Sequence, residues 1–173
     1  HLAAFASFYA AGNRGGVGYS LSRASLTAYC LGRYQAALDF AQAAYAGFVD
    51  LNHNWGLSVV TARLGYAYLG LDRPLEARRW ALHSLELAQA SDRLGRLHAL
   101  GAVAGAMARS GDPEGPPLMR AILADDGMPG LFAIQIRAEL ERHDVPDEDG
   151  TPIDLDGVIE RLLVHSHPAP VLR

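Results

Sequence analysis

The stretch LGYAYLGLDRPLEARRWALHSLELA, residues 64–88, predicts two helices joined by a short polar break at Leu71–Pro74. Both halves are rich in helix formers, and a proline suits the first turn of a helix, where its missing amide proton is not needed. Small residues recur along these otherwise bulky helices, at Gly65, Ala77, Ala81 and Ser84. Small side chains let two helices approach closely while larger neighbours fill the remaining grooves. We therefore expect this stretch to form an antiparallel helical hairpin.

The helical pattern extends over most of the chain. From Leu2 to His143 the apolar residues follow a helical period, and the alternation that is typical of strands is nearly absent. Short polar breaks divide the chain into about eight helices of roughly 10–18 residues. We expect Asp72 and Asp112 to cap the helices that follow them, and the glycine-rich stretch at 12–18 to form a turn. The predicted fold class is all-α.

The small residues also repeat when the chain is shifted by 40 residues. One helical hairpin cannot bury its apolar face alone, whereas stacked hairpins share a continuous core. The repeat therefore predicts three stacked units. Each aligned column holds small or turn-forming residues, apart from Pro117; the columns are Ser25, Gly65 and Gly105; Gly32, Asp72 and Asp112; Ala37, Ala77 and Pro117; Ala41, Ala81 and Ala121; and Ala44, Ser84 and Ala124.

The central unit resembles a tetratricopeptide repeat (TPR). That family has Leu-Gly-x-x-Tyr in its first helix and small residues spaced along its second, and the matching residues here are Leu64, Gly65 and Tyr68, then Ala77, Ala81 and Ser84. The resemblance implies a right-handed α-α superhelix, a solenoid of antiparallel helical hairpins. We expect a single domain over residues 1–173, with repeats at about 17–50, 55–90 and 93–126 and flanking helices at 1–12 and 129–167.

Members of this family bind proteins or peptides in a concave groove lined by their first helices, and long-period arrays of this kind occur in bacterial signalling and transcription regulators. The resemblance therefore implies a non-catalytic protein- or peptide-binding module, the sensor or interaction part of such a regulator. Arginine pairs well with carboxylates and tyrosine adds contact area at low entropic cost, so we expect an acidic partner. The groove positions carry Tyr19, Arg23, Tyr29, Arg63, Tyr66 and Arg109.

Three other interpretations stay open at this point. The groove tyrosines could simply pack in the core while the arginines are solvated. The chain could be a homo-oligomerisation scaffold, a homodimer for example, with Phe5, Tyr9 and Trp55 in a symmetric interface. It could also be an enzyme on a helical scaffold, which needs a pocket where His83 or His98 meets a carboxylate.

Composition limits the classes of partner. The formal net charge is −4, and the 15 basic residues are all arginine, in no block longer than Arg78-Arg79. This acidity argues against direct nucleic-acid binding, and no apolar run approaches the ~20 residues of a membrane span. The single cysteine, Cys30, is expected to be a buried small hydrophobe in a cytoplasmic protein. The chain begins at His1 and not at a methionine, and no signal-peptide pattern follows, so we expect a piece of a longer protein.

No metal, cofactor or catalytic motif is expected. The seven histidines are scattered, and His165 and His167 alone do not complete a zinc site. Glu139 and His143 fall one helical turn apart and are expected on the surface. The acidic stretch at 143–157 departs from the spacing of a calcium loop and is interpreted as a solvated, capped linker.

Overall fold

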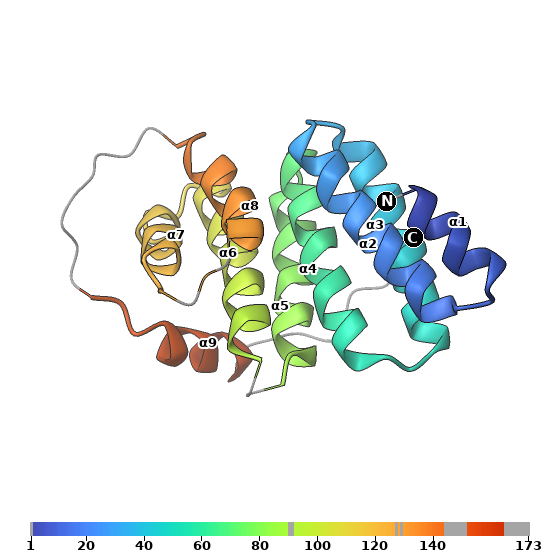
Figure 1. Ribbon diagram of the computed structural model, residues 1–173. Helices are drawn as coiled ribbons and strands as arrows, with labels where there is room; N and C mark the ends of the chain where they lie inside the picture. The colour runs from blue at the N-terminus through green and yellow to red at the C-terminus, as the bar shows by residue number, and fades with distance from the viewer. Residues whose placement is uncertain (1, 90–91, 127, 129, 144–151, 165–173) are drawn as a thin grey trace.

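The computed structural model describes residues 2–89, 92–126, 128, 130–143 and 152–164 of the chain (Figure 1). These residues form helices and no strand, which confirms the all-α prediction. The helices are α1 (Leu2–Ala10), α2 (Arg14–Cys30), α3 (Tyr34–Asp50), α4 (Asn54–Gly70), α5 (Pro74–Leu87), α6 (Arg93–Arg109), α7 (Gly115–Leu123), α8 (Gly130–Leu140) and α9 (Leu155–Val164).

A turn with a left-handed residue at its centre follows each of five helices, α1, α2, α3, α4 and α6. The amide after the left-handed residue donates to a carbonyl five residues back, as Arg33 N does to Ala28 O at 2.9 Å. This bond satisfies a carbonyl that the end of the helix would leave unpaired. The left-handed residues are Gly12, Gly32, Asn52, Asp72 and Gly111, with φ between 50° and 80°.

The first four of these left-handed residues stand 20 residues apart, at positions 12, 32, 52 and 72. As a result α2, α3 and α4 each contain 17 residues. Antiparallel neighbours of equal length begin and end at the same level, so their side chains meet at fixed heights along the hairpin.

Side-chain caps begin α2, α4 and α6 but not the helices between them. Asn13, His53 and Asp92 each accept a hydrogen bond from the amide of the glycine three residues later, at 2.8–2.9 Å. His53 does so through its ring nitrogen Nδ1. By contrast, α3 and α5 follow Arg33 and Arg73, which make no side-chain capping bond. The cap therefore marks the first helix of each hairpin.

The caps correct the repeat spacing that the sequence suggested. They are separated by 40 residues from 13 to 53, but by 39 from 53 to 92. The third unit is thus displaced by one residue: Ala104, and not Gly105, corresponds to Gly65, and Gly111, and not Asp112, is left-handed. The shorter spacing arises because the left-handed residues do not continue at position 92: Asp92 is the cap of α6 and not a turn residue.

Three further local predictions were wrong. Asp72 does not cap α5, because it occupies the left-handed turn position and its carboxylate binds Arg109 instead. The glycine-rich stretch at 12–18 is not a turn beyond Gly12, because α2 already begins at Arg14. The glycines within α2 permit close packing: a Cβ on Gly18 would lie 2.9 Å from the ring of Phe48. Asp112 does not cap α7 either: it accepts from the amide of Glu114 at 3.0 Å, but Glu114 is itself the N-cap residue and α7 has no side-chain capping bond.

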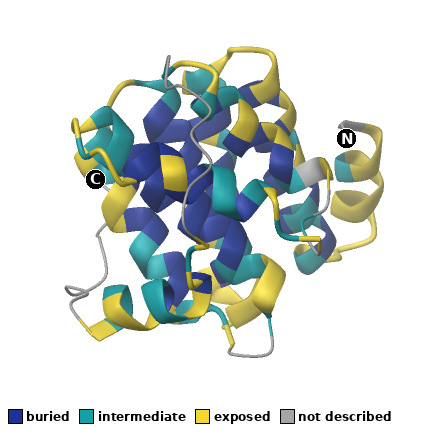
Figure 2. Ribbon diagram, turned by 90° about the vertical axis from the view of Figure 1, so that its left-hand side faces the viewer, coloured by how far each residue is buried: buried dark blue, intermediate teal, exposed yellow. Residues whose placement is uncertain are grey.

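Consecutive helices pack on each other from α1 to α8. In addition, α2 contacts α4, α4 contacts α6, and α6 contacts α8. Buried residues are most numerous in α4 and α6. Figure 2 shows the buried residues of the chain gathered in the middle of the molecule. The small residues noted in the sequence lie at these contacts. A Cβ on Gly65 would stand 3.3 Å from the carbonyl oxygen of Ala77, and Ser84 Oγ donates to Ser58 O at 2.7 Å. Small side chains therefore bring α4 and α5 together.

The predicted flanking segment 129–167 contains two helices that serve different surfaces. α8 packs on α6 and α7, whereas α9 lies against α5, α6 and α7. Arg93 at the start of α6 holds α9 in place, because its guanidinium bridges Asp125 at 2.7 Å and Asp156 at 2.8 Å. Among the described residues, no helix combines the length and apolar character needed to cross a membrane.

Replacing Gly115 by alanine tests the close approach of α6 and α7. Its Cβ would lie 2.5 Å from the amide nitrogen of Ala108, so the helices must separate. We expect Gly115→Ala to lower the free energy of unfolding by about 1–3 kcal/mol in urea titrations. The matched control is Gly47→Ala in α3, where nothing lies within 4 Å and the helix should gain about 0.5–1 kcal/mol. Equal effects at the two positions would contradict this account.

Candidate functional site

α8 covers one face of α4 and α6, and the groups at this contact form the most polar part of the interior. Two glycines of α6 allow the approach: a Cβ on Gly101 would lie 2.7 Å from Ile136, and one on Gly105 would lie 3.0 Å from Glu139. We call this contact the α8 interface. It comprises Arg63 and Tyr66 of α4, His98 and Arg109 of α6, and Phe132, Gln135, Ile136 and Glu139 of α8.

The amide of Gln135 joins two helices at the centre of the interface. Its oxygen Oε1 accepts from Arg63 Nη1 and lies 2.9 Å from His98 Nε2. Burial lowers the pKa of His98 well below its usual value, so the ring is neutral and its Nε2–H donates to the same oxygen. The imidazole is stacked against Tyr66 at 4.9 Å and against Phe132 at 4.5 Å between ring centroids.

Arg63 is a buried guanidinium without a counter-charge. Its residue is 5% exposed, and its pKa is lowered to about 10, chiefly because burial disfavours the charged form. Its Nε atom has no hydrogen-bond partner, and within the described part of the chain no carboxylate pairs with it. The ring of Phe132, 5.6 Å away, provides a weaker cation–π contact. Such a group disfavours the folded state unless an anion approaches it.

Arg109, in contrast, has its charge balanced. It donates to both oxygens of the fully buried Glu139 and reaches Asp72 at 2.9 Å through Nη1. Glu139 was expected on the surface; that prediction was wrong because α8 turns this carboxylate toward α6. His143 Nε2 lies 3.6 Å from the same carboxylate, one helical turn further along.

The end of α8 also reaches the first hairpin. Arg142 donates through Nη2 to the hydroxyl of Tyr34, and its guanidinium lies 5.4 Å from the centroid of that ring. Tyr34 begins α3 and in turn packs 5.4 Å from Tyr29 of α2. This contact, which we call the Arg142–Tyr34 clasp, links residues 108 positions apart.

The structure places the six groove residues from the sequence in three environments. Tyr29, Arg63 and Tyr66 are buried, with Tyr29 and Tyr66 6.0 Å apart, and Arg109 is partly buried beside them. Arg23 is exposed and is close enough to lower the pKa of Arg63 by like-charge repulsion. Tyr19 lies apart, half-buried against Phe48 and Trp55.

The residues of α8 that complete the interface were not found from the sequence. Phe132, Gln135 and Glu139 lie outside the repeat alignment. A flanking helix was expected here, but which of its sides would be buried was not predicted. Their spacing of three and four residues does place them on one side of a helix, which is the signal that could have identified them.

The structure adds little support to the other candidate sites considered from the sequence. His83 Nδ1 lies 3.1 Å from Glu86 on the same helix, and its ring packs 6.3 Å from that of Trp80 between centroids, so the pair has an aromatic neighbour and no further polar group among the contacts of the described residues. No cluster of three or more potential metal ligands occurs in the described ranges. Cys30 is exposed, so its expected burial was wrong. His165 and His167, and most of the acidic stretch at 143–157, lie outside the described residues.

Comparison with known proteins finds no family model, no curated protein and no solved structure that matches this chain. Functional inference therefore depends on the side chains themselves.

The two arginines of the interface should respond in opposite ways to removal of their charge. Arg63→Met removes a buried charge and leaves Gln135 bound to His98, so the free energy of unfolding should stay level or rise by about 1–3 kcal/mol. Arg109→Met strands the carboxylate of Glu139, and the free energy should fall by about 3–5 kcal/mol. Urea titration measures both. A loss at Arg63 as large as that at Arg109 would show that Arg63 is an ordinary structural residue.

The neutral state of His98 predicts a pH dependence of stability. Its pKa is depressed in the folded protein, so below about pH 6.5 only the unfolded chain takes up the proton. This contribution is complete above that pH and is lost as the pH falls, by up to about 1.4 kcal/mol per unit. We expect His98→Gln to show a shallower decline between pH 6.5 and 5 than the wild type, in urea titrations at each pH. The control His83→Gln should keep the wild-type slope.

Proposed function

We propose that this chain is a non-catalytic protein- or peptide-binding module of the tetratricopeptide type, the interaction part of a cytoplasmic bacterial regulator. In this proposal the hairpins α2–α3, α4–α5 and α6–α7 are successive units of a right-handed solenoid. The regular turns, the capped first helices and the contacts of α2 with α4 and of α4 with α6 support it. In this proposal the binding surface lies on the first helices beside α8, which itself covers part of α4 and α6.

The observation that carries the proposal is Arg63. A buried guanidinium without a carboxylate partner among the described residues lowers stability, so its presence is best explained by a ligand that supplies the missing charge. Exposed Arg23 lies near it and can meet the same anion first. Two arginines at one place favour a carboxylate, which accepts paired hydrogen bonds from a guanidinium. We therefore propose an Asp, a Glu or a terminal carboxylate of a partner protein as the group that binds here.

Access to Arg63 passes the edge of α8. Phe132 lies over the guanidinium and Gln135 occupies one of its nitrogens, whereas Nε remains unpaired. In this proposal Phe132 moves aside to let a carboxylate reach Nε. Tyr66 stays beneath the site as a rigid support, because its hydroxyl donates to the carbonyl of His98 at 3.1 Å.

A random peptide library displayed on phage and selected on the purified chain tests this function. We expect the retained peptides to be enriched in Asp and Glu. Their affinity should fall at least about tenfold with Arg63→Met, and about two- to fivefold with Arg23→Ala. Arg79→Ala, an exposed arginine of the second helix α5, serves as the control and should bind normally.

Two results would overturn the proposal. One is a selection that retains no sequence above the background of an empty support. The other is a set of peptides that bind Arg63→Met as tightly as the wild type. Because Arg63→Met is expected to fold at least as stably as the wild type, lost binding could not be attributed to unfolding once circular dichroism shows the same helix content.

Self-association is the second candidate, and exposed aromatic side chains favour it. Tyr9 is 72% exposed and Trp55 is 52% exposed, while Phe5 stacks on Tyr9 at 5.9 Å. Aromatic residues of this kind are enriched at protein interfaces. In light scattering, a dimer that dissociates on Tyr9→Ser would support a homo-oligomeric scaffold, and a monomer at all concentrations would remove it.

A further inference from the structure

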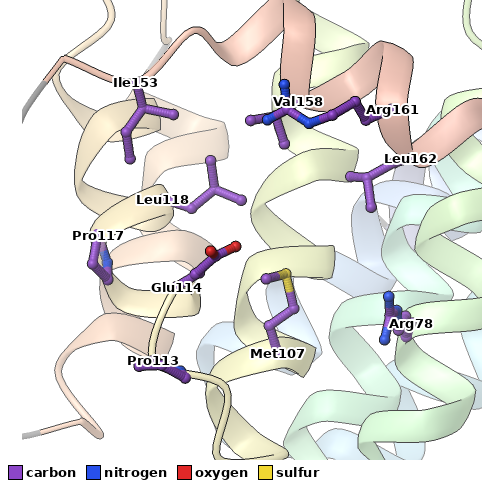
Figure 3. A pocket seen from close by; sticks show the side chains of 10 residues that line it. All are labelled: Arg78, Met107, Pro113, Glu114, Pro117, Leu118, Ile153, Val158, Arg161 and Leu162. Carbon is purple, nitrogen blue, oxygen red and sulfur yellow. The ribbon is translucent and has the colours of Figure 1, made fainter.

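A cleft of about 610 Å³ lies between α5, α6, α7 and α9, and no residue of the α8 interface lines it (Figure 3). This volume is within the range of small-molecule sites, about 300–1,000 Å³. Most of the wall is apolar and comes from helices that are distant in sequence. The apolar side chains include Met107 of α6, Pro117 and Leu118 of α7, Ile153 before α9, and Val158 and Leu162 of α9.

Three charged residues are among the described residues that line the cleft, and two of them are open to a ligand. Arg161 of α9 already has an interaction within the protein. Arg78 of α5 and Glu114, just before α7, are exposed, and neither side chain makes an ion pair or hydrogen bond in the described part of the chain. They lie on opposite sides of the cleft, with Met107 between them (Figure 3). Because these two open charges have opposite signs, an ion of either sign is repelled by one of them, whereas an uncharged molecule is not.

Glu114 gives the cleft a hydrogen-bond acceptor at a fixed place. Its backbone is held on both sides, because its amide donates to Asp112 Oδ1 at 3.0 Å and its carbonyl accepts from the amide of Leu118 at 3.1 Å. The carboxylate points into the cleft from the side of α7 (Figure 3). An ionised carboxylate only accepts hydrogen bonds, so a polar group that meets it must be a donor. A hydroxyl group is such a donor and brings no charge.

The walls of the cleft are held in place by contacts behind them. On the side of α9, Ile159 is fully buried and Arg93 binds Asp156 at 2.8 Å. On the other side, α6 and α7 approach so closely that a Cβ on Gly115 would lie 2.5 Å from the amide nitrogen of Ala108. A preformed site of this kind loses little conformational entropy when it binds a ligand.

We propose that this cleft binds an uncharged apolar molecule that carries a hydroxyl group, such as a medium-chain alcohol. The hydroxyl donates to Glu114, and the hydrocarbon covers Met107, Leu118 and Leu162. Burial of hydrocarbon provides most of the binding free energy, and the hydrogen bond fixes the orientation. Arg78 stays in water at the other side of the cleft. The site is independent of the proposed protein-binding surface, because it uses none of its residues.

Calorimetric titration with decan-1-ol tests the site. We expect saturable binding of one molecule per chain, and weaker binding of decyl methyl ether, which has no donor. Decanoate and decylammonium should also bind at least about twofold more weakly, because each ion loses hydration and is repelled by one open charge of the cleft.

Three variants test the role assigned to Glu114. Glu114→Ala should weaken decan-1-ol about two- to fivefold and leave the ether unchanged, because only the alcohol loses a hydrogen bond. Glu160→Ala, which removes an exposed carboxylate of α9 outside the cleft, is the matched control and should bind both compounds as the wild type does. Arg78→Gln should leave the affinity for the alcohol unchanged, because an uncharged ligand makes no ion pair there.

The position of the ligand is tested at Met107. Its methyl resonance should move on titration and saturate, whereas that of Met128, which packs on the core and does not line the cleft, should stay in place. Met107→Trp should fill the cleft and abolish binding while circular dichroism shows normal helix content. Leu162→Asp, on a partly exposed face of α9, should weaken binding without a change in the core.

The proposal is overturned if decan-1-ol does not bind, or if decanoate or decylammonium binds more tightly than the alcohol. It is also overturned if Glu114→Ala leaves the difference between alcohol and ether unchanged. Binding of the alcohol to both Met107→Trp and Leu162→Asp as to the wild type, or a shift of Met128 in place of Met107, would assign the ligand to another part of the molecule and would contradict the proposal.

Discussion

Five helices of this protein, α1 to α4 and α6, satisfy one of their last carbonyl groups within a very short turn, and that requirement organises the fold. A left-handed residue every 20 positions, from Gly12 to Asp72, ends a helix and returns the chain at once. α2, α3 and α4, which lie between such turns, have the same length, and α5 runs back along α4 after the turn at Asp72. Small residues on α4 and α5 therefore lie against backbone carbonyls of the other helix. Gly65 against Ala77, and Ser58 against Ser84, are such pairs. Close packing of α4 and α5 follows from the turn geometry as much as from the small side chains.

At the interface with α8, two arginines lie in opposite electrostatic environments. Arg109 shares a buried carboxylate with α8 and contributes to holding that helix in place. Arg63 receives only a neutral amide and an aromatic ring from the same helix. α8 carries the carboxylate of Glu139 opposite Arg109 but the neutral amide of Gln135 opposite Arg63. The charge of Arg63 is therefore left unbalanced by this helix. This difference separates a structural ion pair from a buried guanidinium that has no counter-charge among the described residues.

The sequence alone was sufficient to predict the structural features that depend on local chemistry. Helix breaks at Gly32 and Asp72, and the burial of Ala77 and Ala81, follow from turn preferences and from small residues at a helical period. The one-residue displacement of the third unit could not be seen, because an alanine-rich helix matches itself nearly as well in either register. A search for Gly, Asn or Asp every 20 residues would have found the turns directly.

Long-range contacts could not be predicted from the sequence for a different reason. The burial of Glu139 and the surroundings of Arg63 depend on where α8 docks, and that position is decided by contacts with Gly101 and Gly105, about 35 residues away in sequence. Cys30 illustrates the reverse error: a residue type that is usually buried lies at the exposed end of α2, where no later helix covers it.

The Arg142–Tyr34 clasp changes the mechanical character of the molecule. In an open array each unit touches only its neighbours, and the array can flex like a spring along its length. Here the segment after the third hairpin is fastened to the start of α3 in the first. Separating this late segment from α3 must therefore break the contact between Arg142 and Tyr34, so the clasp couples a late part of the chain to its first hairpin.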